Sequence, residues 1–599
     1  MTGRHRDSIL RVDLTRGTVE RERVPGEWRR RFLGGKGLGA RYLYEELAPG
    51  TDPLGPDNLL AFALGPLSGY LPGESRYAAV TKSPLTGTFL DSYGGGAFPD
   101  ALAGALPDCL ALLVTGRADE WTALVVEDGD ARLRPAADLA GADAEATDAA
   151  YDGAVACVGP AGESRVAYAT VATDGGDHHA GRGGAGAVMG AKRLKAIVAR
   201  GDPPEGHADL RERYERAYEE SDVGRWQAAG ETVESLDFAN EVGALATRGW
   251  QSGRFEGAEG IGVEPIRERA VGREHPDRAV PGGFRVETDD GESVPRGATT
   301  MSLGAGLGID EADAVAALGA TCDRLGVDVI SAGSAVAWAI RAAERGLIDR
   351  DLAFGDPEAA RGLVREIATR STPLGDALAD GVAAAAATYG GEEFVPTVKS
   401  MELPAYDPRV APAMALAYAT SDRGACHRRA RPIEAEAFAA GTWTDAERVR
   451  AVVSAQDARS VRWCLVGDDF VAETFDDLGA EWLAAVGLDY TREELARLGE
   501  RVWNLTRLFN AREGFDRTDD RLPEPLREPL DGDEARAIDP AAFERLLDAY
   551  YAARGWGENG LPTRATLARL DLLETADDAT PLDDAGDDGD DGDDRRGEP

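Results

Sequence analysis

The chain has 599 residues, and its 107 aspartates and glutamates outnumber its 66 lysines and arginines, which gives a formal net charge of −41 at pH 7. Such a field repels nucleic acid and anionic lipid, so we expect neither as a partner. The sequence has no run of 18 apolar residues and no apolar segment near residue 1, so it predicts neither a membrane span nor a secretory signal.

The basic residues are unevenly divided, because five are lysines and 61 are arginines. A large acidic excess is an adaptation that halophiles use, so we expect a cytoplasmic protein of a halophilic cell. The few lysines are expected where a compact ammonium is needed and the wide fork of arginine does not fit. They are Lys36, Lys82, Lys192, Lys195 and Lys399.

The pattern of apolar residues divides the chain into regions. Residues 1–204 contain short apolar runs separated by turn residues, such as "NLLAFALG" and "LKAIVARG", and are predicted to form a β-rich domain. Helical spacing then predicts a second domain over 205–390 and a third over 391–573. Residues 255–297 lack periodicity and are predicted to be loops. Residues 574–599 are rich in aspartate and are predicted to be a disordered, solvated tail.

A glycine-rich loop at 180–195, "AGRGGAGAVMGAKRLK", contains a G-x-G-x-x-G match. Arg182, Lys192 and Lys195 supply positive charge for an anion. A dinucleotide fingerprint needs a strand directly before the glycines and a full helix after them, and neither flank provides these, so a nucleotide-linked dehydrogenase is disfavoured. A P-loop fails because no Ser or Thr follows Lys192. Two interpretations stay open: an anion-binding loop, and a glycine-rich turn packed on a sheet.

Three further stretches combine charged side chains with glycine or proline turns. Arg76 precedes a glycine cluster that begins at Gly94, Asp328 stands at a turn before Gly333, and Lys399 lies in a proline-marked loop. Each has an ordinary structural explanation, such as helix capping by the aspartate. Together they predict several anion-binding loops, which suit a large, multiply phosphorylated cofactor.

In this order, the stretches resemble the tungsten-containing aldehyde:ferredoxin oxidoreductase family. The similarity extends to about residue 573 and is carried by "FLGGKGLGARYLYEELAPG", "AGRGGAGAVMGAKRLKAI", "LGVDVISAGSAVAWAI" and "LAYATSDRGACH". It implies an α+β fold, in which an N-terminal double β-sheet domain cradles two pyranopterin dithiolenes and two mainly α-helical domains cover them. It also implies two-electron oxidation of a small aldehyde to a carboxylic acid at tungsten (or molybdenum). The family further implies Mg²⁺, a [4Fe–4S] cluster, ferredoxin or another electron-transfer protein as acceptor, and a homodimer.

The resemblance implies a set of cofactor-binding residues. Arg76 matches the arginine between pterin and cluster, Asp328 opens the first pterin motif, and Lys399 matches the lysine at the second pterin. The loops of Tyr93 and Arg182 match those around the pterin phosphates and Mg²⁺. The full set is Arg76, Tyr93, Gly94, Gly95, Arg182, Gly183, Gly184, Asp328, Ser331, Gly333 and Lys399.

The chain departs from the family pattern at four places. The C-x-x-C-x-x-x-C expected just before "MSLGAGLGI" is missing, and only Cys464 matches a cluster ligand. Because such clusters take four thiolates, we expect this residue to be a buried thiol without a cluster. Arg459 replaces the aspartate that opens the second pterin motif. Met301 aligns with a proposed catalytic glutamate, and Thr397 aligns with a proposed catalytic histidine.

Two proton carriers and two functions therefore remain as hypotheses. His427 and Asp407 are the remaining candidates for proton transfer. The first function is a tungstopterin aldehyde oxidoreductase with an altered electron route, through a docked partner or a partner's cluster. The second is a catalytically degenerate paralogue that binds pterin or a partner subunit. The other cysteines are expected to be small buried hydrophobic residues.

Overall fold

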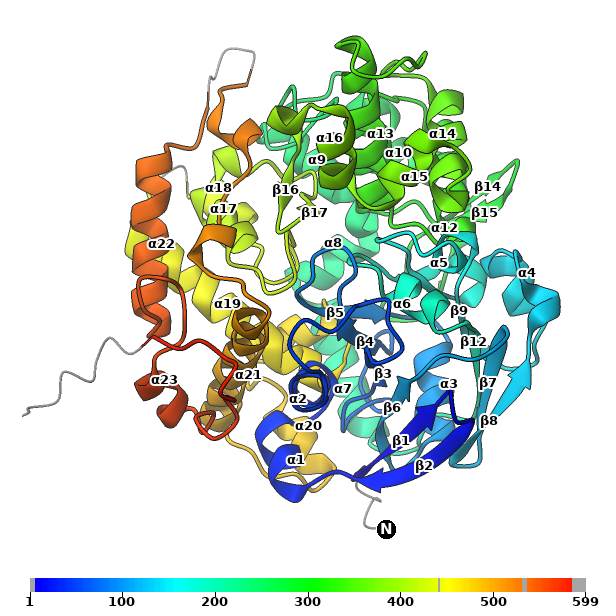
Figure 1. Ribbon diagram of the computed structural model, residues 1–599, viewed down its shortest axis with the longest axis vertical. Helices are drawn as coiled ribbons and strands as arrows, with labels where there is room; N and C mark the ends of the chain where they lie inside the picture. Colours follow the sequence, from blue (N-terminus) through cyan, green and yellow to red (C-terminus); the bar gives the residue numbers. More distant parts are fainter. Residues whose placement is uncertain (1–5, 440–441, 531–535, 584–599) are drawn as a thin grey trace, which may run out of the picture.

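Two six-stranded mixed sheets form the N-terminal part of the computed structural model, which describes residues 6–439, 442–530 and 536–583 (Figure 1). In spatial order the first sheet contains β2 (Thr18–Arg23), β1 (Ser8–Asp13), β6 (Cys109–Thr115), β3 (Leu60–Ala63), β4 (Tyr77–Lys82) and β5 (Phe89–Gly94). The second contains β11 (His178–Ala180), β10 (Val171–Thr173), β9 (Ala154–Cys157), β12 (Leu194–Arg200), β7 (Thr122–Glu127) and β8 (Asp130–Pro135). Within these two sheets as described, the pairs β1–β6 and β12–β7 are parallel and the other neighbouring strands are antiparallel.

A shared apolar core joins the two sheets. It combines residues of the first sheet, such as Phe62 and Leu112, with residues of the second, such as Leu124 and Ile197. The helices α3 (Phe98–Ala105) and α6 (Ala185–Ala191) contribute to the same core. The strands β3 and β4 are buried along their whole length, as expected for apolar runs that are covered on both faces. The predicted double β-sheet domain is therefore confirmed.

The rest of the chain is largely helical, as predicted. Capping boxes start α19 (Asp445–Leu465) at Thr444 and α21 (Arg492–Arg512) at Thr491, because each threonine exchanges hydrogen bonds with a glutamate three residues later. The other long helices include α12 (Ala312–Leu325), α13 (Val329–Glu344), α14 (Pro357–Thr369) and α22 (Pro540–Arg554). Among the described residues, none of the helices combines the length and apolarity that a bilayer crossing requires.

The helical part closes over the sheets from two directions (Figure 1). The helices α19 and α21 pack on α2 (Gly35–Glu46) and share an apolar core with the first sheet. A second core runs through α12, α13 and α14 and includes residues 166–169, which precede β10. Functional residues from distant parts of the chain therefore meet where these layers join.

Two local predictions were wrong. Residues 255–297 are not only loops, because they contain α10 (Val263–Arg269) and a small sheet of β13 (Ala270–Arg273), β14 (Phe284–Thr288) and β15 (Gly291–Ser293). Residues 574–583 are not a solvated tail, because Leu582 packs on the core of α19 and α21, and Thr580 bonds to the buried Tyr44. The rest of the predicted tail, 584–599, lies outside the described residues.

Candidate functional site

The described residues enclose a cavity of about 300 Å³ between the sheets and the helical part. Its wall takes residues from β5, from the glycine loop before α6, from the turn between α12 and α13, and from the end of α19. A long loop that follows α17 (Pro412–Ala419) belongs to the wall as well, as do segments around His178, Thr232, Ala298, Ala405 and Phe470. Each region that the sequence analysis singled out as an anion-binding loop lies near this cavity, with the exception of the loop of Lys399.

Arginine side chains dominate the wall of the cavity. Eight reach it, against six carboxylates, in a protein whose overall charge is strongly negative. The arginines are Arg76, Arg182, Arg296, Arg423, Arg428, Arg429, Arg431 and Arg459. We call this site the cationic cavity.

Four of these arginines hold buried nitrogen atoms that have no hydrogen-bond partner among the described residues. They are Nε of Arg76, Nε and Nη1 of Arg182, Nε of Arg423 and Nη1 of Arg429. A buried donor without a partner costs about 1–3 kcal/mol, so native proteins normally supply an acceptor. Phosphate oxygens bind guanidinium groups well. The donor set therefore fits the phosphorylated pterin cofactor that the resemblance implies.

The glycine loop turns sharply before it enters α6. Arg182, Gly183 and Gly184 have φ values of 69°, 70° and 87°, so three successive residues are left-handed. A Cβ at Gly184 would lie 2.2 Å from the carbonyl oxygen of Ala167, so only glycine fits there. This turn places the arginine on the cavity wall, with its side chain buried.

Asp328 has both of the roles considered for it. Its carboxylate caps α13 by accepting a hydrogen bond of 2.9 Å from the backbone N–H of Ser331. The same carboxylate lines the cationic cavity and lies 3.6 Å from Nε of Arg182. Nη2 of that arginine donates to the carbonyl oxygen of Glu402. A structural cap and a cavity residue are therefore the same group.

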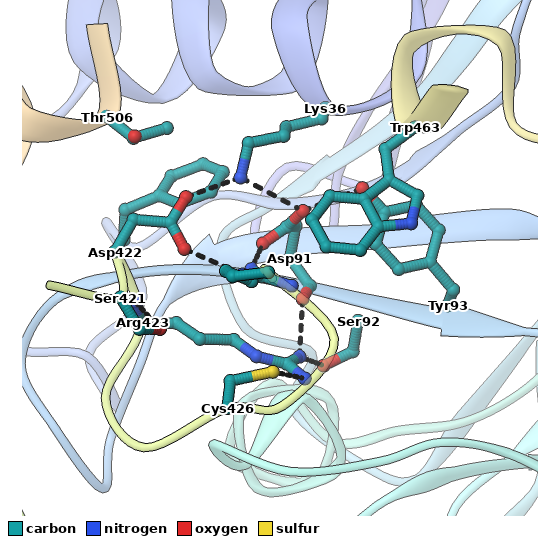
Figure 2. A network of polar contacts seen from close by, with 12 residues as sticks. Lys36, Asp91, Ser92, Tyr93, Ser421, Asp422, Arg423, Cys426, Trp463 and Thr506 are labelled. Atoms are coloured by element: carbon teal, nitrogen blue, oxygen red, sulfur yellow. Dashed lines mark hydrogen bonds and ion pairs between the residues drawn. The ribbon is translucent and has the colours of Figure 1, made fainter. Parts of the chain in front are cut away.

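A buried network of four charges lies behind the cavity (Figure 2). The ammonium of Lys36 bonds to Asp422 and lies 3.4 Å from Asp91. Arg429 donates from Nε to Asp422 at 2.7 Å and from Nη2 to Asp91. All four side chains are at most 3% exposed, and two positive groups face two negative ones. Burial lowers the pKa of Lys36 to about 7.

Tyr93 and Arg423 connect this network to the cavity wall. The tyrosine donates from Oη to Asp91 at 2.6 Å, and its ring stacks on Trp463 with centroids 5.2 Å apart. Arg423 donates to the carbonyl oxygen of Asp91 at 2.7 Å and to Oγ of Ser92 at 3.2 Å. These contacts tie β5 of the N-terminal domain to the loop that follows α17 and to α19.

Four of the eleven residues implied to bind the cofactor line the cavity: Arg76, Tyr93, Arg182 and Asp328. The other seven do not reach its wall and are Gly94, Gly95, Gly183, Gly184, Ser331, Gly333 and Lys399. The first two glycines instead make room for side chains. A Cβ at Gly94 would meet the ring of Tyr77, and one at Gly95 would meet Glu74 and Arg76. Cofactor binding by the eleven residues stays a prediction.

All five lysine side chains are buried, but the two beside the glycine loop do not face the cavity. Lys192 donates to three backbone carbonyl oxygens, and Lys195 pairs with Glu163. The expectation that these two complete the charge of the loop was therefore wrong. Lys399 bonds to Asp520 at 2.6 Å, away from the cavity wall.

The two candidate proton carriers differ in position. His427 lies on the cavity wall, and its Nδ1 has no hydrogen-bond partner among the described residues. Burial and the neighbouring Arg428 and Arg431 hold the pKa of this histidine well below its usual value, so the ring is neutral. Asp407 is fully buried off the wall, where burial raises its pKa and Oδ1 accepts a hydrogen bond from a backbone N–H.

The residues that replace expected family residues do not all lie on the cavity wall. Met301 and Arg459 line the cavity, so these two changes alter the wall itself. Thr397 lies in β16 (Thr397–Val398), which pairs with β17 (Met401–Glu402), and is not on the wall. Three histidines do reach the wall: His178, His179 and His427.

The residues present do not fit a [4Fe–4S] cluster. All five cysteines of the chain are free and buried, as predicted. Burial raises the pKa of Cys464 to about 12, so this thiol stays protonated. Within the described ranges, no group of three or more histidine, cysteine or acidic side chains is placed to hold a metal ion.

The segment that lacks the family cysteines instead contributes to an ionic cluster at the edge of the cavity. Nδ1 of His178 lies 2.9 Å from Glu74, and its Nε2 lies 3.3 Å from Glu274. Arg296 pairs with Glu274 at 2.9 Å. We call these four residues the rim network. The carboxylate of Glu74 also pairs with Arg76 at 2.6 Å.

A group of wall residues in the loop 421–431 was not predicted from the sequence. Arg423, Arg428, Arg429 and Arg431 all reach the cavity from this one loop. Their density, four arginines within nine residues, was the available signal. Cys426, between the first two, was predicted to be a buried hydrophobic residue and proves to be on the wall as well.

A double-sheet domain that helices close over a cationic cavity defines an α+β class of protein with an internal anion site. The stretch 9–201 matches the model of the aldehyde ferredoxin oxidoreductase N-terminal domain, and 209–572 matches that of domains 2 and 3 of the same enzymes. The chain belongs to the aldehyde ferredoxin oxidoreductase family.

Individual relatives agree with this assignment. A "tungsten-containing aldehyde ferredoxin oxidoreductase" of Pyrococcus abyssi is 34% identical over 94% of this chain and 98% of its own length. The "aliphatic sulfonate oxidoreductase, WOR-like subunit" of Pyrococcus furiosus is 25% identical, over 94% and 97%. The solved active-site complex BamBC of benzoyl coenzyme A reductase has the same fold, with a TM-score of 0.80, 23% identity and coverage of 96% and 98%.

Proposed function

We propose that this chain binds a tungsten bis-pyranopterin and oxidises an aldehyde to a carboxylic acid. The observation that carries the proposal is the cationic cavity, in which Arg76, Tyr93, Arg182 and Asp328 come together around unpartnered donors. The Pyrococcus relatives named as tungsten-containing aldehyde ferredoxin oxidoreductases support the metal and the reaction class.

The bound tungstopterin supplies the two-electron redox chemistry, and the residues of the chain supply binding and proton handling. Arg182 and Arg76 would hold anionic groups of the cofactor through their free nitrogens. Asp328 keeps the guanidinium of Arg182 in place. His427 is neutral and exposes Nδ1 in a buried site, so it can hold a proton at that atom.

We also propose that electrons leave this chain without passing through a cluster of its own. The single cysteine at the family's cluster position is a protonated thiol, and the rim network occupies the cysteine-free segment. The acceptor would be ferredoxin, as the names of the relatives indicate, or another electron-transfer protein. It would have to approach closely enough to receive electrons from the cavity directly.

The test is a metal and pterin analysis of the protein purified without oxygen in concentrated salt. The proposal predicts tungsten and two pterins per chain, aldehyde oxidation with an artificial dye, and iron far below four atoms per chain. Four irons per chain would overturn the electron route while leaving the reaction class intact. Protein without metal and pterin would overturn the enzymatic proposal itself.

A second candidate is a catalytically degenerate paralogue that binds pterin or a partner subunit. The observation that favours it is Met301, which lies on the cavity wall where the resemblance places a glutamate. A thioether cannot act as a general base. Pterin without any dye-linked aldehyde oxidation would support this candidate over the first.

A further inference from the structure

Cys426 lies on the wall of the cationic cavity, close to two positive side chains. Figure 2 shows its sulfur beside the guanidinium of Arg423, whose Nη2 donates to Sγ at 3.0 Å. None of the other four cysteines lines this cavity. The position of Cys426 therefore sets it apart from the buried cysteines of the apolar cores.

The charges around this sulfur favour its ionised form. Burial alone would raise the pKa of Cys426, but Arg423 and Arg182 outweigh burial, and the pKa is lowered. At Cys157 and Cys464 burial prevails and raises the pKa to about 12. Because the thiolate is the nucleophilic form of cysteine, Cys426 is the one thiol of the chain prepared for reaction.

Unpartnered donors lie on the same wall. Nε of Arg423, a residue that is only 4% exposed, has no hydrogen-bond partner among the described residues. Nδ1 of the adjacent His427 also has none within the described ranges, and the neutral ring can donate from this atom. A thiolate next to free N–H groups is the arrangement that stabilises a tetrahedral adduct and its oxygen.

We propose that Cys426 is a nucleophile that adds to the carbonyl carbon of an aldehyde bound in the cationic cavity. The S–C bond forms, the C=O π bond breaks, and its electron pair moves to the oxygen. The oxygen then takes up one proton, equivalent to the one that the thiol lost on ionising. The product is a thiohemiacetal, and no oxidant is consumed. The choice of an aldehyde rests on the proposed function.

The addition would hold the substrate at a fixed point of the cavity. The carbon becomes tetrahedral and keeps its hydrogen, and its oxygen can accept from an unpartnered N–H of the same wall, such as Nε of Arg423. The neighbouring arginines favour the thiolate, which lessens the demand for a general base at this step. The route is therefore compatible with Met301 on the cavity wall.

The first experiment compares the five thiols within the purified protein. It is treated with iodoacetamide at pH 7 in concentrated salt, and alkylation of each cysteine is followed by peptide mass spectrometry. We expect Cys426 to react at least about tenfold faster than Cys157 and Cys464, since only its thiolate is stabilised. In Arg423→Gln this rate should fall about tenfold. A Cys426 that reacts no faster than Cys157 would overturn the proposal.

The second experiment looks for the adduct itself. Benzaldehyde labelled with ¹³C at the carbonyl carbon is added to the protein without electron acceptor, and the protein-bound carbon is observed by NMR. We expect a resonance of a tetrahedral carbon that is absent in Cys426→Ser. In the same variant, kcat/KM for benzaldehyde should fall at least about tenfold while tungsten and pterin content stay unchanged.

The outcomes separate this inference from the proposed function. The inference is wrong, and the proposed function stands, if two results are found together. Cys426→Ser oxidises benzaldehyde as fast as the unmodified chain, and the unmodified chain gives no resonance of a tetrahedral carbon. If the protein holds neither tungsten nor pterin, the proposed function fails. Fast alkylation of Cys426 and an adduct in that protein would still support the nucleophile.

Discussion

The cationic cavity and the rim network are neighbouring sets of buried charges. They differ in whether their buried polar atoms all have hydrogen-bond partners. In the cavity, Arg76, Arg182, Arg423 and Arg429 keep nitrogens without partners among the described residues. In the rim network, no buried side-chain nitrogen or oxygen of the four described residues lacks a partner. The two sets of charges therefore differ in their unpartnered donors, which the described residues of the cavity have and those of the rim network do not.

The difference in unpartnered donors concerns the two groups that the family resemblance implies, the pterin cofactor and the iron–sulfur cluster. The set of donors for an anionic cofactor is present, whereas the thiolates for a cluster are replaced by ion pairs. Glu274 binds the cysteine-free segment to His178 of the second sheet, and Arg296 of the same segment pairs with Glu274. The segment thus keeps an attachment to the N-terminal domain that needs no metal.

The largest effect is expected at the charge network behind the cavity. Asp422→Asn removes one of the two carboxylates that face Lys36 and Arg429 in a site closed to water. Breaking a buried ion pair by removing one partner costs about 3–5 kcal/mol. We expect a loss of this size in the free energy of unfolding, measured with urea in concentrated KCl. The control Glu481→Gln weakens an exposed ion pair with Arg213 and keeps an acceptor for Tyr214, so it should cost less than about 1 kcal/mol. Equal losses in the two variants would contradict the structural role of the network.

The next effect concerns the ligand of the cavity. Arg182→Ala removes two unpartnered nitrogens from the cavity wall, so pterin content per chain should fall at least about tenfold after gel filtration. The matched control is Arg6→Ala, which removes a buried arginine bound only to backbone carbonyl oxygens outside the cavity. It should destabilise the protein and leave the pterin content unchanged. An unchanged content in Arg182→Ala would refute the assignment of the glycine loop.

The sequence predicted the two large sheets correctly, but it did not predict the structure of the segments 255–297 and 574–583. Apolar runs marked the strands of both sheets, because buried strands need continuous apolar residues. The segment 255–297 gave no such signal, since its short strands alternate charged residues and are only partly buried. Residues 574–583 were misjudged because a few contacts hold them on the core, namely the apolar side chains of Ala576 and Leu582, the bond of Thr580 to Tyr44 and the ion pair of Asp577 with Arg512.

The candidate site could be predicted only in part. Arg182 and Asp328 stood out because glycines and a helix start surround them. The arginines of 421–431 were missed because their convergence depends on how a long loop folds over β5, which local spacing does not record. Lys192 and Lys195 were wrongly expected to add charge to the anion site, because closeness in sequence does not fix where a side chain points. They are near the glycine loop in sequence, but their ammonium groups point to carbonyl oxygens and to Glu163.

A smaller effect is expected where the family places its last cluster ligand. Cys464→Ser puts a hydroxyl into an apolar core beside Gly37 and Val502, which should cost about 1 kcal/mol of unfolding free energy. Iron content should be the same in the variant and the unmodified chain, because no cluster depends on this sulfur. The matched variant Cys157→Ser lies in another core and should behave alike. Loss of iron in Cys464→Ser alone would show that this sulfur is a ligand.

The smallest effect is a pH dependence of the rim network. Burial alone would lower the pKa of His178, but Glu74 and Glu274 outweigh it, and the pKa is raised. Protonation therefore stabilises the folded form, fully below the unfolded value of about 6.5, and this stabilisation is lost as the pH rises through the folded pKa. His178→Gln should thus cost more stability at pH 6 than at pH 9, by less than the loss in Cys464→Ser. Comparing the variant with the unmodified chain isolates the contribution of His178 to the pH dependence of stability. His275 and His427 have lowered pKa values, so their contributions change with pH in the opposite direction. An equal loss of unfolding free energy at both pH values would mean that the charge of His178 does not stabilise the rim network.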